Sequence, residues 1–358
     1  MKIQYSYEKH PLRWWHLPLL IILIAGTIMA MYGERNKRSA DIDNVTKPWS
    51  QRNMQRCEGM VFGTVYHITY QYPTNLEDSI TAELQKVDDS LSPFNKQSTI
   101  TAVNENTDLS ADAMLAEVFL LSKRVSQDTF GAFDITVAPL VNLWGFGFKN
   151  MENVSQDRVD SLMQYVGFEK VKLEGNTITK TTPEIMLDCS AIAKGYGVDA
   201  VGKMLERQGI RSYMVEIGGE VRLRGCNPSG KNWSIGITKP EDDSLSLQSE
   251  IERIITTTDV SIATSGNYRN FYVKNNKKYA HTIDPRTGYP VQHSILSATV
   301  LAHDCAVADA YATAFMVLGL DSAQIVLNKD TTLKAFFIYT TDDGTTSQWC
   351  SPGIPGVR

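Results

Sequence analysis

Residues 212–225 read SYMVEIGGEVRLRG, two short β-forming runs separated by a pair of glycines. Strands joined by so short a glycine turn form a hairpin, and the two strands of a hairpin are antiparallel. We therefore expect strands at 212–217 and 220–224, with Gly218 and Gly219 in the turn. The hairpin favours an α+β fold with largely antiparallel sheets and packed helices.

The sequence on either side of this hairpin continues as runs of strands with few helices. On the C-terminal side we expect strands at 233–238, 254–263, 270–274 and 297–301, then a helix over 305–318 that ends at Gly319. On the N-terminal side we expect a strand from Val61, a strand at 178–187, and helices at 75–90, 112–127 and 191–208. Ser110 or Asp112 is a suitable N-cap for the helix at 112–127. This irregular alternation agrees with the α+β class.

The composition indicates a globular enzyme. The 358 residues include 35 Lys and Arg against 40 Asp and Glu, for a net charge of -5, and 42% of them are hydrophobic. A hydrophobic content this high argues against disorder, and the absence of a basic stripe argues against a nucleic-acid partner. The five cysteines are widely spaced and form no C-x-x-C pair. They therefore indicate neither a zinc site nor a disulfide framework.

An apolar segment near the N-terminus predicts attachment to a membrane. Residues 17–32 carry no charge and follow Trp14 and Trp15, side chains that suit the membrane interface. We expect one N-terminal transmembrane helix, acting as a signal anchor. A cleaved signal peptide is the alternative, although the small residues near Ala30 make a poor cleavage site.

The chain is thereby divided into four predicted parts. They are a membrane anchor or signal at 1–32, a polar linker at 33–56, a folded domain at 57–350 and a C-terminal tail at 351–358. Lys and Arg residues balance on the two sides of the apolar segment, so charge alone does not set its orientation. We expect the anchor in the inner membrane and the folded domain on its periplasmic side.

Residues 187–197 form the first candidate site, where an apolar run ends at Asp188 and opens into a helix. Backbone N–H groups at such a junction suit a phosphate, and Lys194 is available for an anion. Asp188 has two readings of equal weight. It caps the helix, or it accepts hydrogen bonds from a ligand.

The predicted helix at 305–318 carries the second candidate site. Asp309 and Thr313 are four residues apart and so share one helix face. A carboxylate, a hydroxyl and nearby backbone carbonyls are ligands that suit Mg²⁺. The alternative is a buried aspartate that bonds only to backbone, because a buried carboxylate needs a partner.

Two further segments carry groups suited to catalysis and ligand binding. Residues 280–290 place His281 before a turn rich in Pro and Gly, where it could act as a general base near neutral pH. Asp284 and Arg286 are expected to form the internal scaffold of that turn. Residues 131–147 contain three aromatic side chains among glycines, which suits a flat ligand, although such clusters are more often core.

Taken in order, seven segments resemble the ApbE family of flavin transferases. They are FGT at 62–64, GAFDITVAPLVNLWGFG at 131–147, LDCSAIAKGYGVD at 187–199, VEIGGEVRLRG at 215–225, IATSGNYRN at 262–270, HTIDPRTGYP at 281–290 and ADAYATA at 308–314. The resemblance covers about residues 57–350 and leaves residues 1–56 outside it. Seven ordered segments are far more specific than any one of them alone.

The resemblance implies an ApbE-like fold and a Mg²⁺-dependent transfer of FMN from FAD to a threonine or serine hydroxyl of a partner protein, with release of AMP. A membrane redox subunit is the partner that an anchored enzyme would suit. Mg²⁺-dependent hydrolysis of FAD to FMN and AMP is an alternative, since water can replace the protein hydroxyl. A flavin-binding carrier without catalysis is a third reading.

The resemblance also implies roles for individual residues of this chain. The metal would be held by the side chains of Asp309 and Thr313 and by the backbone of Ala191. His281 would be the base that deprotonates the acceptor hydroxyl. The flavin nucleotide would contact Phe62, Phe94, Ala132, Phe133, Asp134, Asp188, Lys194 and Ile283.

This chain departs from the family pattern at two of these positions, Phe62 and Lys194, and at Ala312 beside the metal ligands. Many members have Met at the position of Phe62, and some have Glu at that of Lys194. Some also have Asp where this chain has Ala312, so its metal site would hold one carboxylate fewer.

Overall fold

The computed structural model of the protein describes residues 53–147, 154–239, 251–266, 271–274, 277–292 and 294–354. The predicted membrane helix within residues 1–32 lies outside this part of the chain. No helix in the described residues is long and apolar enough to cross a bilayer. Strand β1 (Met54–Val61) begins before residue 57, so regular structure starts within the segment that we expected to be linker.

One eight-stranded sheet organises the fold. Every neighbouring pair in it is antiparallel, which confirms the predicted class. In spatial order its strands are β1, β2 (Thr64–Gln71), β5 (Tyr213–Ile217), β6 (Glu220–Arg224), β9 (Val260–Gly266), β12 (Ile295–Ala302), β13 (Lys334–Thr340) and β14 (Thr346–Cys350). Strands β1, β13 and β14 were not expected from the sequence.

Three two-stranded antiparallel sheets accompany the large one. They are formed by β3 (Val171–Glu174) with β4 (Thr177–Lys180), β7 (Trp233–Thr238) with β8 (Ile251–Thr257), and β10 (Phe271–Lys274) with β11 (Lys277–Ala280). Trp233, Ile237 and Ile255 of β7 and β8 are buried against apolar residues of β6, β9, β12 and β13. Sheet β7–β8 therefore packs on the large sheet.

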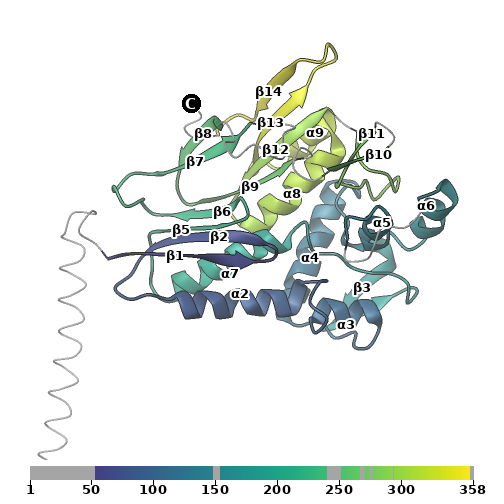
Figure 1. Ribbon diagram of the computed structural model, residues 1–358, viewed down its shortest axis with the longest axis horizontal. Helices are drawn as coiled ribbons and strands as arrows, with labels where there is room; N and C mark the ends of the chain where they lie inside the picture. The colour runs from purple at the N-terminus through teal and green to yellow at the C-terminus, as the bar shows by residue number, and fades with distance from the viewer. Residues whose placement is uncertain are drawn as a thin grey trace, which may run out of the picture. The chain divides into compact units, whose positions relative to one another are not determined.

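Helices cover the sheet. Figure 1 shows α2, α7 and α8 lying along it, with α7 in contact with β5 and β6, and α8 in contact with β9 and β12. The α-helices of the described residues are α2 (Glu77–Leu91), α3 (Thr99–Glu105), α4 (Ala113–Asp128), α5 (Ala138–Leu143), α6 (Gln156–Met163), α7 (Ala193–Arg207), α8 (Cys305–Leu318) and α9 (Leu320–Lys329).

The hairpin predicted at 212–224 is present as β5 and β6, with Ile217 paired to Glu220 across the turn. Gly218 and Gly219 have φ values of +61° and +105°, a region that residues with a Cβ rarely adopt. The predicted caps also hold. Asp112 accepts a hydrogen bond from the Leu115 amide at 2.8 Å, and Gly319 ends α8.

Two predicted strands were wrong in extent. The run 178–187 is a strand only as far as Lys180. Beyond Lys180 the Asn104 side chain makes the hydrogen bonds that a neighbouring strand would make. Its amide nitrogen donates to the Leu187 carbonyl, and its amide oxygen accepts from the Leu187 N–H. The run 254–263 is divided between β8 and β9, and Asp259 between them has a φ of +53°, which turns the chain.

Helices α7 and α8 are joined by a buried carboxylate. Asp199 of α7 is 2% exposed and accepts hydrogen bonds from the backbone amides of Cys305 and Ala306 at 3.0 and 2.9 Å. It therefore caps the N-terminus of α8 from a different helix. Arg222 of β6 donates to the same carboxylate at 2.6 Å, which ties both helices to the sheet.

We expect Asp199→Asn to lower the free energy of unfolding by about 3–5 kcal/mol, because it leaves Arg222 and the first amides of α8 without their buried carboxylate. Urea denaturation measures the loss. Asp304→Asn is the matched control, since Asp304 also contacts Arg222 but its side chain is 42% exposed, and we expect about 0–1 kcal/mol. Equal losses in the two variants would contradict the capping role.

Candidate functional site

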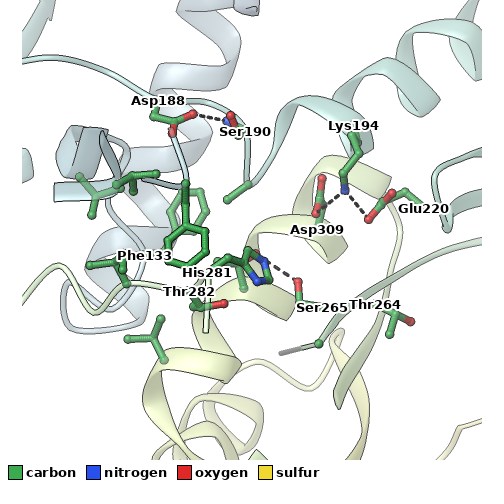
Figure 2. Close-up of a pocket in the computed structure, with 18 of the residues that line it drawn as sticks. Phe133, Asp188, Ser190, Lys194, Glu220, Thr264, Ser265, His281, Thr282 and Asp309 are labelled. Carbon is green, nitrogen blue, oxygen red and sulfur yellow. Dashed lines mark hydrogen bonds and ion pairs between the residues drawn. The ribbon is translucent and has the colours of Figure 1, made fainter. Parts of the chain in front are cut away.

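A cavity of about 520 Å³ lies where the N-terminus of α7, the middle of α8 and the end of β9 meet. Figure 2 shows side chains from these elements and from the loop after β11 pointing into it. The residues that line it include most of those that the sequence singled out: Ala132, Phe133, Asp134, Asp188, Ala191, Lys194, His281, Ile283, Asp309 and Thr313. Packing thus brings together four of the predicted segments that are far apart in the chain.

Phe62 and Phe94 do not line this cavity. The Phe62 ring packs on Gly197 of α7, where a Cβ would stand 2.6 Å from a ring carbon. Phe94 is 66% exposed in the connection between α2 and α3. Their predicted contact with a flavin therefore stays a prediction.

The first residues of α7 meet the middle of α8 at the polar end of the cavity. Oδ2 of Asp309 accepts a hydrogen bond from the Gly195 amide at 2.9 Å. A Cβ at Gly195 would lie 2.5 Å from the Cys305 carbonyl oxygen, so only glycine lets the two helices approach this closely. The Thr313 hydroxyl, one turn along α8, lies 3.2 Å from the Ser265 hydroxyl of β9.

Glu220 is a residue of the cavity to which the sequence analysis assigned no role. Its Oε1 lies 2.6 Å from Nζ of Lys194, and the same ammonium lies 3.9 Å from Oδ1 of Asp309. Figure 2 shows Lys194 between the two carboxylates. The position of Glu220 directly after the Gly218–Gly219 turn was the one sequence signal that could have found it, since such turns present the first strand residue at a sheet end.

Burial and mutual contact shift the pKa values of the three charged groups in this cluster. Desolvation raises the pKa of Glu220 from 4.5 to about 7, and the ammonium of Lys194 offsets only part of the effect. Desolvation also raises the pKa of Asp309, against the lowering by Lys194 and the Gly195 amide. Burial would lower the pKa of Lys194, but Asp309 and Glu220 outweigh it and the pKa is raised. Lys194 is therefore a permanent cation at neutral pH.

Two more carboxylates lie on the other side of the cavity. Asp134 accepts hydrogen bonds from the amide and the hydroxyl of Thr136 at 2.8 and 2.7 Å. Asp188 accepts one from the Ser190 amide at 2.8 Å. It does not cap α7, which begins at Ala193. Burial raises the pKa of both Asp134 and Asp188.

His281 stands at the start of a rigid loop. Asp284 bonds the backbone and the guanidinium of Arg286 at 2.9 Å, which confirms the expected scaffold of the turn. Trp144 donates from Nε1 to the Gly288 carbonyl at 2.8 Å, and this ties the loop to α5. The His281 ring lies edge-on to Phe146, with centroids 6.4 Å apart.

The donors that could hold a metal are oxygens of mixed type. In the described part of the chain, no group of three or more His, Cys, Asp or Glu residues forms a metal site. The cavity instead gathers the Asp309 carboxylate, the Thr313 hydroxyl and the Ala191 backbone. Oε2 of Glu220 is also buried there with no hydrogen-bond partner among the described residues. Hard oxygen donors of this kind, with an excess of negative charge, fit Mg²⁺.

The cavity therefore combines two chemistries. Aromatic and apolar side chains, among them Phe133, Phe146 and Ile283, can hold a flat ring, and the cluster of Lys194, Glu220 and Asp309 can hold a charged group together with a cation. His281 lies in the same cavity and can accept a proton there.

We expect Gly195→Ala to lower the free energy of unfolding by about 1–3 kcal/mol, because the new Cβ would press on backbone atoms of α8 that cannot yield. Thermal or urea unfolding measures the loss. Gly236→Ala is the matched control, since a Cβ at Gly236 makes only ordinary contacts of 3.4–3.5 Å with Ile251. A Gly195→Ala variant as stable as wild type would show that α7 and α8 do not need this close approach.

Comparison with known proteins places the chain among flavin transferases. A sequence model described as the ApbE family matches residues 62–337. The chain is similar to the FAD:protein FMN transferase of Vibrio cholerae, at 39% identity over 297 residues that cover 80% of this chain and 87% of the relative. It is also similar to the enzyme of the same name from Haemophilus influenzae, at 37% identity over 305 residues, which cover 80% and 86% of the two chains.

The structure gives the same result. It is similar to the solved structure of the flavin transferase ApbE from Vibrio cholerae, with a TM-score of 0.76 and 37% identity, and the match covers 85% of this chain and 98% of that one. The flavinyl transferase ApbE from Pseudomonas stutzeri, in its apo form, gives a TM-score of 0.75 at 29% identity, covering 84% of this chain and 95% of that one.

Proposed function

Because the chain belongs to the ApbE family, we propose that it transfers FMN from FAD to a threonine or serine hydroxyl of a partner protein, with Mg²⁺ as cofactor and AMP as the second product. It is similar over four fifths of its length to enzymes named FAD:protein FMN transferase, and it is an enzyme of that class. The observation that carries the proposal is the single cavity that joins His281, Asp309 and the aromatic segment at 131–147.

The cavity suggests how FAD is oriented. The flavin ring lies against the apolar part, where Phe133 and Ile283 offer flat or aliphatic surface. Asp134 and Asp188 accept hydrogen bonds from ring N–H or ribitol hydroxyl groups on this side. The pyrophosphate lies toward the N-terminus of α7, where Lys194 contributes a positive charge.

The residues at the polar end fit Mg²⁺. Asp309, Thr313 and the backbone of Ala191 would hold it. Two buried carboxylates, Asp309 and Glu220, share the single ammonium of Lys194, and Oε2 of Glu220 has no hydrogen-bond partner among the described residues, so a further cation would find favourable charge here. When bound, Mg²⁺ neutralises the charge of the pyrophosphate and so makes its phosphorus easier to attack. The Gly195 amide and the Ser265 hydroxyl hold Asp309 and Thr313 in place for this role.

The transfer needs one base and one attacking hydroxyl. The acceptor oxygen bonds to the phosphorus of the FMN half, the bond from that phosphorus to the bridging oxygen breaks, and AMP leaves with the bridging oxygen. The hydroxyl proton passes to His281, whose loop is fixed by Trp144 and by the Asp284–Arg286 pair. Positioning and charge neutralisation supply most of the rate, as in other phosphoryl transfers.

The N-terminal anchor, which lies outside the described residues, completes the proposal. The uncharged run at 17–32 supports a single span or a signal in the inner membrane, with the folded domain on the periplasmic side. An enzyme held there would meet acceptors that are themselves subunits of membrane redox complexes.

To test the proposed transfer, the full-length protein is incubated with FAD and Mg²⁺, with and without a purified candidate acceptor. AMP release and in-gel flavin fluorescence are then measured. We expect AMP release that depends on the acceptor, together with a fluorescent acceptor band. Asp309→Ala should abolish the Mg²⁺-dependent turnover, because it removes the carboxylate that would hold the metal.

Controls separate the alternatives. An acceptor whose target hydroxyl residue is replaced by valine or alanine should give neither product. AMP with free FMN in the absence of acceptor would instead indicate a hydrolase. Tight FAD binding without any AMP would indicate a carrier and would contradict the proposal.

We expect His281→Ala to slow transfer by about 10²–10⁴-fold while FAD binds with nearly unchanged affinity, because the side chain acts on the acceptor proton. Single-turnover kinetics measure the first quantity, and quenching of flavin fluorescence measures the second. His303→Ala is the control, since His303 does not line the cavity and its exposed ring lies beside Asp304, at 3.1 Å. A loss of FAD affinity equal to the loss of rate would make His281 a binding residue.

A further inference from the structure

We propose that Glu220 is a positioning residue that holds the Lys194 ammonium away from Asp309 and so keeps the Asp309 carboxylate available to a divalent cation. The inference rests on the metal site of the proposed function.

The contacts of Lys194 are the first support. Its Nζ lies 2.6 Å from Oε1 of Glu220, a short charge-assisted contact, but 3.9 Å from Oδ1 of Asp309, which is beyond hydrogen-bond distance. In the described residues, no other carboxylate comes within 4.0 Å of this ammonium. The ammonium is therefore bonded to one carboxylate and only near the other.

The ammonium and a divalent cation would compete for the same carboxylate. Both are positive, and Asp309 already gives one oxygen, Oδ2, to the Gly195 amide. Oδ1 is the oxygen that faces Lys194. An ammonium bonded directly to Oδ1 would occupy a metal-binding oxygen and would repel the incoming cation, most strongly at a buried carboxylate such as Asp309, where solvent screens charges least.

Glu220 is well placed to prevent this contact because its own position is fixed. It is the first residue of β6, pairs with Ile217 across the two-glycine turn, and is 3% exposed. Lys194 has a long and flexible side chain that is 31% exposed. The rigid carboxylate therefore determines where the flexible ammonium lies.

The buried state of Glu220 gives a second reason why the pair stays together. A buried carboxylate is costly unless it is paired, and the ammonium of Lys194 is its only charged partner in the described residues. Oε2 has no hydrogen-bond partner among the residues that the structure describes. Moving Lys194 onto Asp309 would leave Glu220 uncompensated, so the native pairing is favoured over the competing one.

Binding of Mn²⁺ to the full-length protein, measured by isothermal titration calorimetry in the absence of FAD, tests the inference. Glu220→Gln removes the charge that retains Lys194, and we expect the Kd for Mn²⁺ to rise by about tenfold or more. In Lys194→Met/Glu220→Gln the competing ammonium is gone as well, and we expect the Kd to return toward the wild-type value. Lys194→Met alone should bind Mn²⁺ at least as tightly as wild type.

Glu83→Gln is the matched control for the loss of one negative charge. Glu83 is a mostly buried glutamate that pairs with Lys86 and Arg207 on α2 and α7, outside the cavity. We expect its Kd for Mn²⁺ to equal that of wild type. Thermal unfolding of each variant shows that it is folded, and Lys194→Met decides the question if Glu220→Gln does not fold.

Three results would overturn the inference. One is an unchanged Kd in Glu220→Gln. Another is a double variant as weak as Glu220→Gln, which would make Glu220 a direct ligand of the cation. The third is weaker Mn²⁺ binding in Lys194→Met. Absence of Mn²⁺ binding to wild type would remove the metal site itself, whereas the transferase reaction is tested separately by AMP release and acceptor fluorescence.

Discussion

Two buried carboxylates join helices α7 and α8 in opposite directions, and the cavity depends on both. Asp199 of α7 accepts from the first amides of α8, and Asp309 of α8 accepts from the Gly195 amide near the start of α7. Each carboxylate satisfies backbone donors that a helix leaves unpaired at its N-terminus. The two contacts fix both the spacing and the register of the helices, and with them the positions of Lys194, Asp309 and Thr313.

The large sheet holds the two helices through side chains of β6 and β9. Arg222 links β6 to Asp199, and Glu220 on the same strand meets Lys194, so one strand contacts α7 at two points. The Ser265 hydroxyl at the end of β9 forms a hydrogen bond with the Thr313 hydroxyl. The loop that begins at His281 is tied to the end of α5 through Trp144. Lys194, Thr313 and the loop of His281 are thus each held by a neighbour to which the proposed reaction assigns no chemical step.

Several parts of this arrangement were predicted from the sequence. The hairpin of β5 and β6, helix α8 with its Gly319 end, and the Asp284–Arg286 turn all follow from residues that are close in sequence. Other features could not be read in this way. Strand 178–187 was cut short because Asn104, 83 residues from Leu187, replaces a strand partner. Strand 254–263 was divided because Asp259 adopts a left-handed conformation that aspartate tolerates but does not require.

The sequence by itself determined the fold class, the family and ten of the residues that line the cavity, since motifs and periodicity are local properties of the chain. Only the tertiary structure decided which of these groups interact. Lys194 and Glu220 are 26 residues apart, and Gly195 and Asp309 are 114 apart. Contacts over such separations form only when the helices and strands pack together. Packing buries the charged groups in one cavity, where their attraction is stronger and where an unpaired charge would be costly.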